Sequence, residues 1–342
     1  MPLLHAEEIS YPQVQQLQRD RSIAFLSVSA LEVHGPHLPL GMDMFMARWQ
    51  AEETARRFAE AHPDWTVVLY PHLPLGTDEL PLPGSVDGTQ QTVYRALLAH
   101  GASLAKAGFG YAAVTNGHGG PRHASALAAA CRRASRRHAI QMFSPSIAVL
   151  YGIVAGPRHD QLEANLGRPL TEKERQGLLH GEHAGTMETS FALAERADQV
   201  DPTYRELEQD GPPPFRPLAA AGRRLAPAFG GNSGRVREIS DSLAGGVGWL
   251  LNAHYGYGRP DKVTYQGDPS AASAELGHAI RETMVQGCLE YVEKVTSGEL
   301  AAEDVRSIAS DPAIIQPGFW QRLGLGAAVV GVVGLWWATR RR

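Results

Sequence analysis

Cysteine is scarce in this chain: its 342 residues include only Cys131 and Cys288. Two thiols so far apart in sequence form neither a disulfide framework nor a CxxC metal site, so we expect reduced cysteines in a cytoplasmic protein. The first residues, MPLLHAEEISYP, also lack the basic and apolar segments of a secretory signal.

Neither positive nor negative charge is in large excess. The chain has 32 Lys and Arg against 36 Asp and Glu, which gives a net charge of −4 and a pI near 6.4. This balance offers no electrostatic reason to expect nucleic acid as a partner. With 43% hydrophobic and 20% charged residues, the composition is that of a folded protein and argues against general disorder.

Short apolar strands alternate with helical segments along most of the chain. We expect strands at 23–28, 66–70, 111–115 and 140–143, and helices at 44–61, 92–107, 122–138 and 268–292. The alternation predicts an α/β protein with a mostly parallel sheet covered on both faces and a ligand site at the carboxyl ends of its strands. The Pro- and Gly-rich stretch 204–248 breaks the pattern, and we expect it to be a functional covering or an oligomer contact.

The stretch LEVHGPHLPLGMD, residues 31–43, follows the first predicted strand. Glu32 and His34 are two positions apart, so on extended backbone they point to the same side. Asp43 comes after a constrained loop, immediately before a predicted helix. Carboxylates and imidazole gathered at a strand end suit Zn, Mn or Fe. Alternatively, Asp43 only caps its helix, and His34 is a buried histidine whose hydrogen bonds are satisfied.

Two later stretches add side chains of the same kinds. In TNGHGGPRH, residues 115–123, His118 follows a strand and lies between glycines, where backbone can approach a ligand closely. A phosphate-binding loop is a weaker interpretation, because no lysine and no Gly-x-Gly-x-x-Gly spacing follows. GEHAGTMETS, residues 181–190, contains Glu182, His183 and Glu188. The adjacent Glu182 and His183 suit proton transfer beside a metal ion, and a charged helix start is the alternative.

Together these motifs resemble those of the creatininase (creatinine amidohydrolase) family, over roughly residues 5–295. The matching residues, in order, are Glu32-x-His34-Gly35-x-His37-Leu38-Pro39 with Asp43, then Asn116-Gly117-His118, then Glu182-His183-Ala184-Gly185-x-x-Glu188-Thr189-Ser190. The resemblance implies a three-layer α/β/α fold with a two-metal centre. It also implies hydrolysis of a non-peptide carbon–nitrogen bond in a small cyclic amide or formamide, by a homo-oligomer that is often a hexamer.

The resemblance also implies individual roles. Glu32 and His118 would hold one divalent ion (Zn, Mn or Fe), and His34 would hold the other. Asp43 would bridge the two ions. Glu182 and His183 would line the substrate side as the catalytic pair.

Gly120 marks the main departure from creatininases proper, which carry an acidic ligand at this position. One ion would therefore gain a ligand from Glu188 or from water. The Gly-Gly members of the family, formamide-opening deformylases and the mycofactocin maturation peptidase, look closer. Leu179 and His180 replace a tryptophan common before Glu-His, which argues against creatinine as the substrate. The alternatives to a small-amide hydrolase are a peptidase-type member and a catalytically idle, metal-bearing scaffold that serves as a membrane-tethered assembly or binding module.

One long apolar run lies near the C-terminus. From Leu323 to Ala338 there are sixteen residues without a charge, and arginines follow at 340–342. This length is near the lower limit of about 17 residues for a spanning helix, and Trp336 and Trp337 suit a membrane interface. A helix buried against the body or in an oligomer contact is the alternative. We expect a hydrolase domain at 1–296, a linker at 297–318 and an apolar tail at 319–342 that anchors the protein to a membrane.

Removal of residues 318–342 is expected to leave a soluble, metal-loaded and active body and to abolish membrane association. The reason is that the tail contains apolar surface but no predicted site residue. Fractionation of full-length and truncated protein, followed by assay of both, checks this. A truncated body that misfolds or loses its oligomeric state would make the tail part of the core or of a subunit contact.

Overall fold

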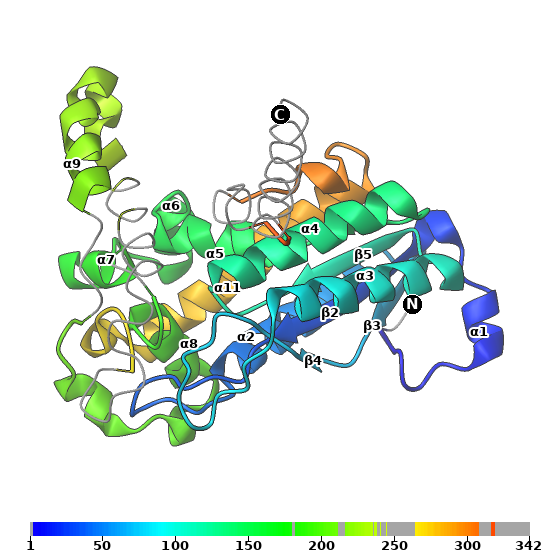
Figure 1. Cartoon of the computed structure of the whole chain (residues 1–342), viewed down its shortest axis with the longest axis horizontal. Helices are drawn as coiled ribbons and strands as arrows, with labels where there is room; N and C mark the ends of the chain where they lie inside the picture. The colour runs from blue at the N-terminus through cyan, green and yellow to red at the C-terminus, as the bar shows by residue number, and fades with distance from the viewer. Residues whose placement is uncertain are drawn as a thin grey trace, which may run out of the picture.

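A parallel sheet forms the centre of the protein (Figure 1). The computed structural model describes residues 3–179, 182–210, 216–234, 236–237, 240, 244, 264–307 and 316–318. The strands are β1 (Leu4–His5), β2 (Ser22–Ser29), β3 (Thr66–Leu69), β4 (Leu73–Pro74), β5 (Tyr111–Thr115) and β6 (Gln141–Phe143). Their order is β1-β3-β2-β5-β6, with β4 paired to the end of β2. Each pairing between these strands is parallel, which confirms the expected α/β class.

The central strand β2 joins the two faces of the sheet. All of its residues are buried, and its side chains alternate between two hydrophobic clusters. Ala24, Leu26 and Val28 pack in the cluster formed with α3 (Gln90–Ala107) and α4 (Pro121–Arg137). Ile23 and Phe25 pack in the cluster formed with α2 (Met42–Ala61) and α11 (Ala274–Thr296). An apolar strand of this kind is typical of a parallel sheet covered on both faces.

Two helical layers enclose the sheet. In Figure 1, α3 and α4 run together across one face, and α2 and the long α11 cover the other. The protein is therefore the three-layer α/β/α structure that the sequence predicts. The other helices of the described residues are α1 (Tyr11–Gln15), α5 (Ser146–Val154), α6 (His159–Leu166), α7 (Glu172–Leu179), α8 (Thr186–Glu195) and α9 (Arg216–Leu225). Short 3-10 turns are η1 (Arg19–Arg21), η2 (Ala197–Gln199), η3 (Pro202–Glu206), η4 (Ala226–Asn232), η5 (Pro269–Ala271) and η6 (Ala302–Asp304).

The start of α2 differs from the expectation. The helix begins at Met42 with Gly41 as its N-cap, so Asp43 lies inside the first turn and does not cap the helix. The physical reason is the tight turn before it, in which the Met42 N–H donates to the Pro39 carbonyl at 3.2 Å. The Asp43 side chain is thereby left available for contacts outside its own helix.

The segment after α11 packs on the body over its first part. Ala302 and Val305 are buried in the same cluster as Phe143 of β6. Residues 308–315 and the tail 319–342 lie outside the described residues, so the predicted linker boundary and membrane anchor stay predictions. Within the described residues, no helix has both the length and the apolar character that a membrane span needs.

The contact between α11 and α8 leaves no room for a side chain at Gly277. A Cβ at this position would lie 1.9 Å from the Ser190 carbonyl oxygen, which belongs to backbone and cannot rotate away. Gly277→Ala should therefore destabilise the protein by about 1–3 kcal/mol, although alanine favours a helix by up to about 1 kcal/mol.

Gly287→Ala in the same helix is the matched control for this substitution. A Cβ there meets side-chain atoms of Val149 and Arg158 at 2.8–3.0 Å, and these atoms can shift. Urea unfolding of both variants measures the difference. Equal stability of the two variants would contradict the packing argument.

Candidate metal centre

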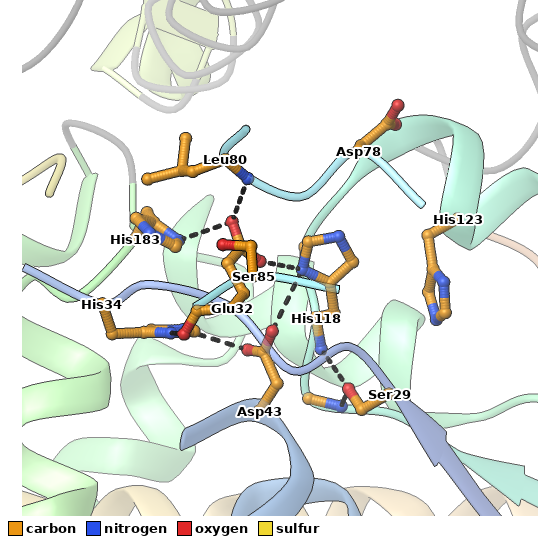
Figure 2. A network of polar contacts seen from close by, with 12 residues as sticks. Ser29, Glu32, His34, Asp43, Asp78, Leu80, Ser85, His118, His123 and His183 are labelled. Atoms are coloured by element: carbon orange, nitrogen blue, oxygen red, sulfur yellow. Dashed lines mark hydrogen bonds and ion pairs between the residues drawn. The ribbon is translucent and has the colours of Figure 1, made fainter. Parts of the chain in front are cut away.

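The site lies where β2 and β5 end, side by side. Their register pairs Ser27 with Thr115, so the segments that follow leave the same edge of the sheet together. Glu32 follows β2, His118 follows β5, and both are buried. Figure 2 shows their side chains turned toward one another, with Asp43 of α2 between them and His34 beside them. The carboxyl ends of parallel strands therefore form the site, as the sequence predicts.

The Ser29 hydroxyl and a close backbone contact fix the Asn116-Gly117-His118 turn. The Ser29 hydroxyl donates to Asn116 Oδ1 at 2.9 Å and accepts the N–H groups of Gly117 at 3.2 Å and His118 at 3.1 Å. A Cβ on Gly117 would lie 2.3 Å from the backbone oxygen of Asp43. Glycine is therefore required here, because the first turn of α2 passes directly over the turn that presents His118.

Three imidazole rings are held by backbone carbonyls. The hydrogen bonds join His34 Nδ1 to Glu32 O at 3.0 Å, His118 Nε2 to Thr77 O at 3.0 Å, and His183 Nε2 to Val33 O at 2.8 Å. A carbonyl oxygen only accepts, so each of these ring nitrogens carries a proton. In the neutral ring the opposite nitrogen then has a free lone pair. Metal-ligating histidines show the same arrangement.

The opposite nitrogens face carboxylates. His118 Nδ1 lies 3.0 Å from Glu32 Oε2 and 3.1 Å from Asp43 Oδ2. His34 Nε2 lies 3.3 Å from Asp43 Oδ1 and 3.4 Å from Glu188 Oε2. Asp43 thus directs one oxygen at each histidine and stands between the two halves of the site.

The electrostatics of the site call for positive charge. Burial lowers the pKa of His34, but the charges of Asp43 and Glu188 outweigh it and raise that pKa to about 10. Burial likewise opposes charge on His118, yet Glu32 and Asp43 raise its pKa well above the usual value. Burial raises the pKa of Asp43, and the two histidines more than reverse this, so it lies well below its usual range. Carboxylates buried so deeply need cationic neighbours.

A pair of divalent cations fits this donor set. Two groups, Glu32–Asp43–His118 and His34–His183–Glu188, each offer ligand atoms that lie within 4.8 Å of one another. Glu32 Oε2, His34 Nε2 and Asp43 Oδ2 are buried and have no hydrogen-bond partner among the described residues. Carboxylate oxygen together with imidazole nitrogen is a donor mixture that Zn, Mn and Fe accept.

All five predicted ligands, Glu32, His34, Asp43, His118 and Glu188, belong to these groups. His183 was expected to transfer protons, and it joins the second group as well. Its ring stacks on His34 at a centroid distance of 4.4 Å, and its Nδ1 lies 3.8 Å from Glu32 Oε1. Burial lowers the pKa of His183, so the ring is neutral and its Nδ1 is an acceptor. Its position suits either a ligand or a proton acceptor, and its role stays a prediction.

Glu182, the other predicted catalytic residue, lies beside both groups. Its Oε1 accepts the Glu188 N–H at 2.9 Å, whereas its buried Oε2 has no hydrogen-bond partner among the described residues. Burial, together with the nearby charge of Glu188, raises the pKa of Glu182 well above the usual value. Burial therefore favours the protonated form of this carboxyl over its charged form.

A pocket opens onto the two groups. Its lining includes the ionisable residues Glu32, His118, Glu182, His183 and Glu188. The other lining residues are Gly119, Gly120, Pro121, Leu150, Tyr151, Val154, Met187 and Gln266. A small molecule in this pocket would meet both apolar side chains and the carboxylates and imidazoles.

Sequence reasoning missed the segment Thr77–Leu80, which crosses the site. Leu80 donates its N–H to Glu32 Oε1 at 2.9 Å, and the Thr77 carbonyl holds His118. Within this segment Glu79 is buried, which raises the pKa of its carboxyl to about 8. No local signal in TDELPLPGS could have revealed these contacts, because they are made by backbone groups with residues far along the chain.

Comparisons with known proteins agree with this fold and donor set. The chain matches the family model Creatininase, described as creatinine amidohydrolase, over residues 7–292. The protein therefore belongs to the creatininase family, whose members are hydrolases that act on carbon–nitrogen bonds. A comparison with curated proteins finds no match.

Solved structures of creatininases share the fold. A structure named Creatininase Mn matches with a TM-score of 0.55 and 19% identity, covering 85% of this chain and 98% of that one. A single-residue creatininase variant described as Zn-Zn type matches with a TM-score of 0.54 and 18% identity, covering 86% and 98%. A putative creatinine amidohydrolase from Bacteroides fragilis matches with a TM-score of 0.53 and 19% identity, covering 86% and 96%. At identities this low, the likeness to these structures shows that the fold is shared, and nothing beyond the fold.

Asp43→Ala is expected to abolish binding of both ions, because among the described residues Asp43 alone directs oxygens at both His34 and His118. His118→Ala should lose one ion and keep the other. Metal content of each variant after dialysis against the free ion measures this. Two ions retained in Asp43→Ala would contradict its position between the groups. The control is His62→Ala, which removes a histidine paired to Glu293 at 2.8 Å outside the site and should leave both ions bound.

Proposed function

We propose that this protein is an amidohydrolase that opens a non-peptide carbon–nitrogen bond of a small cyclic amide or formamide at a centre of two divalent ions, Zn, Mn or Fe. The observation that carries the proposal is the placement of Asp43. Its two oxygens lie 3.3 Å from His34 Nε2 and 3.1 Å from His118 Nδ1, the geometry of a carboxylate between two cations.

In this proposal the first ion would be held by Glu32, His118 and Asp43, and the second by His34, Glu188 and Asp43. Glu188 then replaces the acidic ligand that creatininases proper carry at the position of Gly120. When bound, such ions lower the pKa of a water molecule to near neutrality, and they polarise the carbonyl of the amide substrate.

The chain's own groups supply the proton transfers. His183 can take up a proton only at Nδ1, because its Nε2–H is committed to the Val33 carbonyl at 2.8 Å. Glu182 lines the pocket, and its buried Oε2 has no hydrogen-bond partner among the described residues. That carboxyl is within the pocket where a leaving nitrogen would need a proton, so we assign it the role of general acid.

The pocket walls support a small neutral substrate. Among its described lining residues there is no Lys or Arg, so no such side chain would pair with an anionic group of a substrate. Tyr151 is a neutral phenol, because burial raises its pKa to about 12, and it donates to the Gly119 carbonyl at 3.2 Å. Leu150, Val154 and Met187 add apolar surface. These features suit the carbon skeleton of a cyclic amide or formamide, the substrates implied by the family resemblance.

The test is a substrate screen on the metal-loaded protein. Full-length protein loaded with Zn²⁺, Mn²⁺ or Fe²⁺ is assayed against cyclic amides, formamides and peptides, with Asp43→Ala as the blank. Turnover of a small amide supports the proposal. Turnover of peptides alone would identify a peptidase-type member instead. Bound ions with no turnover of any class would favour the idle scaffold. Sedimentation of the same samples tests the homo-hexamer, which rests on the family resemblance.

Glu182→Gln should keep both ions and reduce kcat by about 10²–10⁴-fold, the usual contribution of general acid–base catalysis. Glutamine preserves the hydrogen bond to the Glu188 N–H but cannot release a proton. His183→Ala is the companion variant. A similar loss of kcat with both ions retained would make His183 a proton carrier, whereas loss of one ion would make it a ligand. Unchanged turnover in Glu182→Gln would contradict the assignment of the general acid.

A further inference from the structure

The segment Thr77–Leu80 holds two ligands of the same metal group, one from each of its ends. The Thr77 carbonyl accepts the His118 Nε2–H at 3.0 Å, and the Leu80 N–H donates to Glu32 Oε1 at 2.9 Å. Figure 2 shows the segment passing over both side chains, with Asp78 at the far side of His118. The segment thereby sets which nitrogen of His118 is free and how the Glu32 carboxylate is turned.

Asp78 fastens this segment to the body. Its side chain is buried, and its Oδ2 accepts the backbone N–H of Arg122 at 2.6 Å, while its Oδ1 accepts from the Arg122 Nε–H. Arg122 lies in the first turn of α4, where backbone N–H groups have no partner within the helix and a carboxylate is favoured. Asp78 also has a φ of 76°, a conformation that aspartate and asparagine tolerate better than most residues.

The segment Thr77–Leu80 packs directly against Gly120. A Cβ at Gly120 would lie 2.5 Å from His118 Nε2, 2.8 Å from Asp78 Cβ and 3.0 Å from the Thr77 oxygen. The position that carries an acidic ligand in creatininases proper is thus filled, in this chain, by the backbone that orients His118. An acidic side chain at position 120 and this placement of Thr77 and Asp78 exclude each other.

We propose that Asp78 is a positioning residue for the Glu32–Asp43–His118 group. By fixing the segment to α4, it keeps the Thr77 carbonyl and the Leu80 N–H where they orient two ligands. This inference rests on the proposed metal centre and adds a residue that touches neither ion. In the described structure, the hydrogen bonds of residues 77–80 reach Glu32 and His118 but not His34 or Glu188, so the effect is confined to one ion.

The experiment is a Co²⁺ titration of the metal-free, full-length protein, followed by visible absorption. Wild type should bind two ions. Asp78→Ala should bind one ion as wild type does and the other about 10–100-fold more weakly, the usual cost of losing a group that orients a metal ligand. Asp78→Asn keeps an oxygen for the Arg122 N–H and tolerates the positive φ, so it should recover most of the lost affinity.

Two controls separate positioning from folding. Asp64→Ala removes an aspartate that pairs with Arg21 at 2.6 Å on the surface, and it should leave both affinities unchanged. Thermal unfolding of each metal-free variant reports on the fold itself. If Asp78→Ala does not fold, Gly120→Ala is the substitute, because the added Cβ would displace the same segment. This variant should weaken the binding of the same single ion.

The outcomes are distinguishable. If wild type binds two ions and Asp78→Ala binds both equally well, the positioning role is overturned and the metal centre stands. Equal weakening of both ions overturns it too, because the segment would then act on the whole site. If wild type binds no ion at all, the proposed function itself fails.

Discussion

The parallel pairing of β2 with β5 is the constraint on which the rest of the site depends. Because Ser27 lies opposite Thr115, the two segments that follow leave the sheet together, and Ser29 receives the backbone N–H groups of the His118 turn. Glu32 and His118 are distant in sequence but meet at 3.0 Å for this reason. A shift of this register would separate the carboxylate from the imidazole, whatever their identities.

Buried negative charge is the second determinant of the site. Glu32, Asp43 and Glu188 are nearly inaccessible to solvent, and their charges raise the pKa values of His34 and His118 against the opposing effect of burial. Protons on those rings and divalent cations satisfy the same demand, since they occupy the same lone pairs. The buried carboxylates and imidazoles are therefore arranged to bind cations. The chain belongs to a family of hydrolases that act on carbon–nitrogen bonds.

Backbone carbonyls determine which ring nitrogen of each histidine in the site carries a proton and which is free. Val33, Glu32 and Thr77 each take one ring N–H, and this leaves the nitrogen that faces the carboxylates free on all three rings. The carbonyls come from different segments, two after β2 and one from the crossing segment Thr77–Leu80. The chemistry of the proposed centre consequently depends also on the segment Thr77–Leu80, which contributes no ligand of its own, and Asp78 links this segment to α4.

The sequence by itself determined the alternation of strands and helices along the chain and which carboxylates and imidazoles gather at the sheet edge, because these follow from hydrophobic periodicity and from motifs of adjacent residues. The strand 111–115 was predicted with its observed bounds, and Glu32, His34, Asp43, His118 and Glu188 do gather at the sheet edge. The sequence misplaced the start of α2, which is set by a turn at Pro39, and could not reveal the contacts of Thr77, Asp78 and Leu80. Those contacts, the free nitrogen of each ring and the joining of His183 to His34 and Glu188 were decided by the tertiary structure alone. The physical reason is that each depends on backbone groups brought close by folding, and such proximity leaves no pattern in the residues that make it.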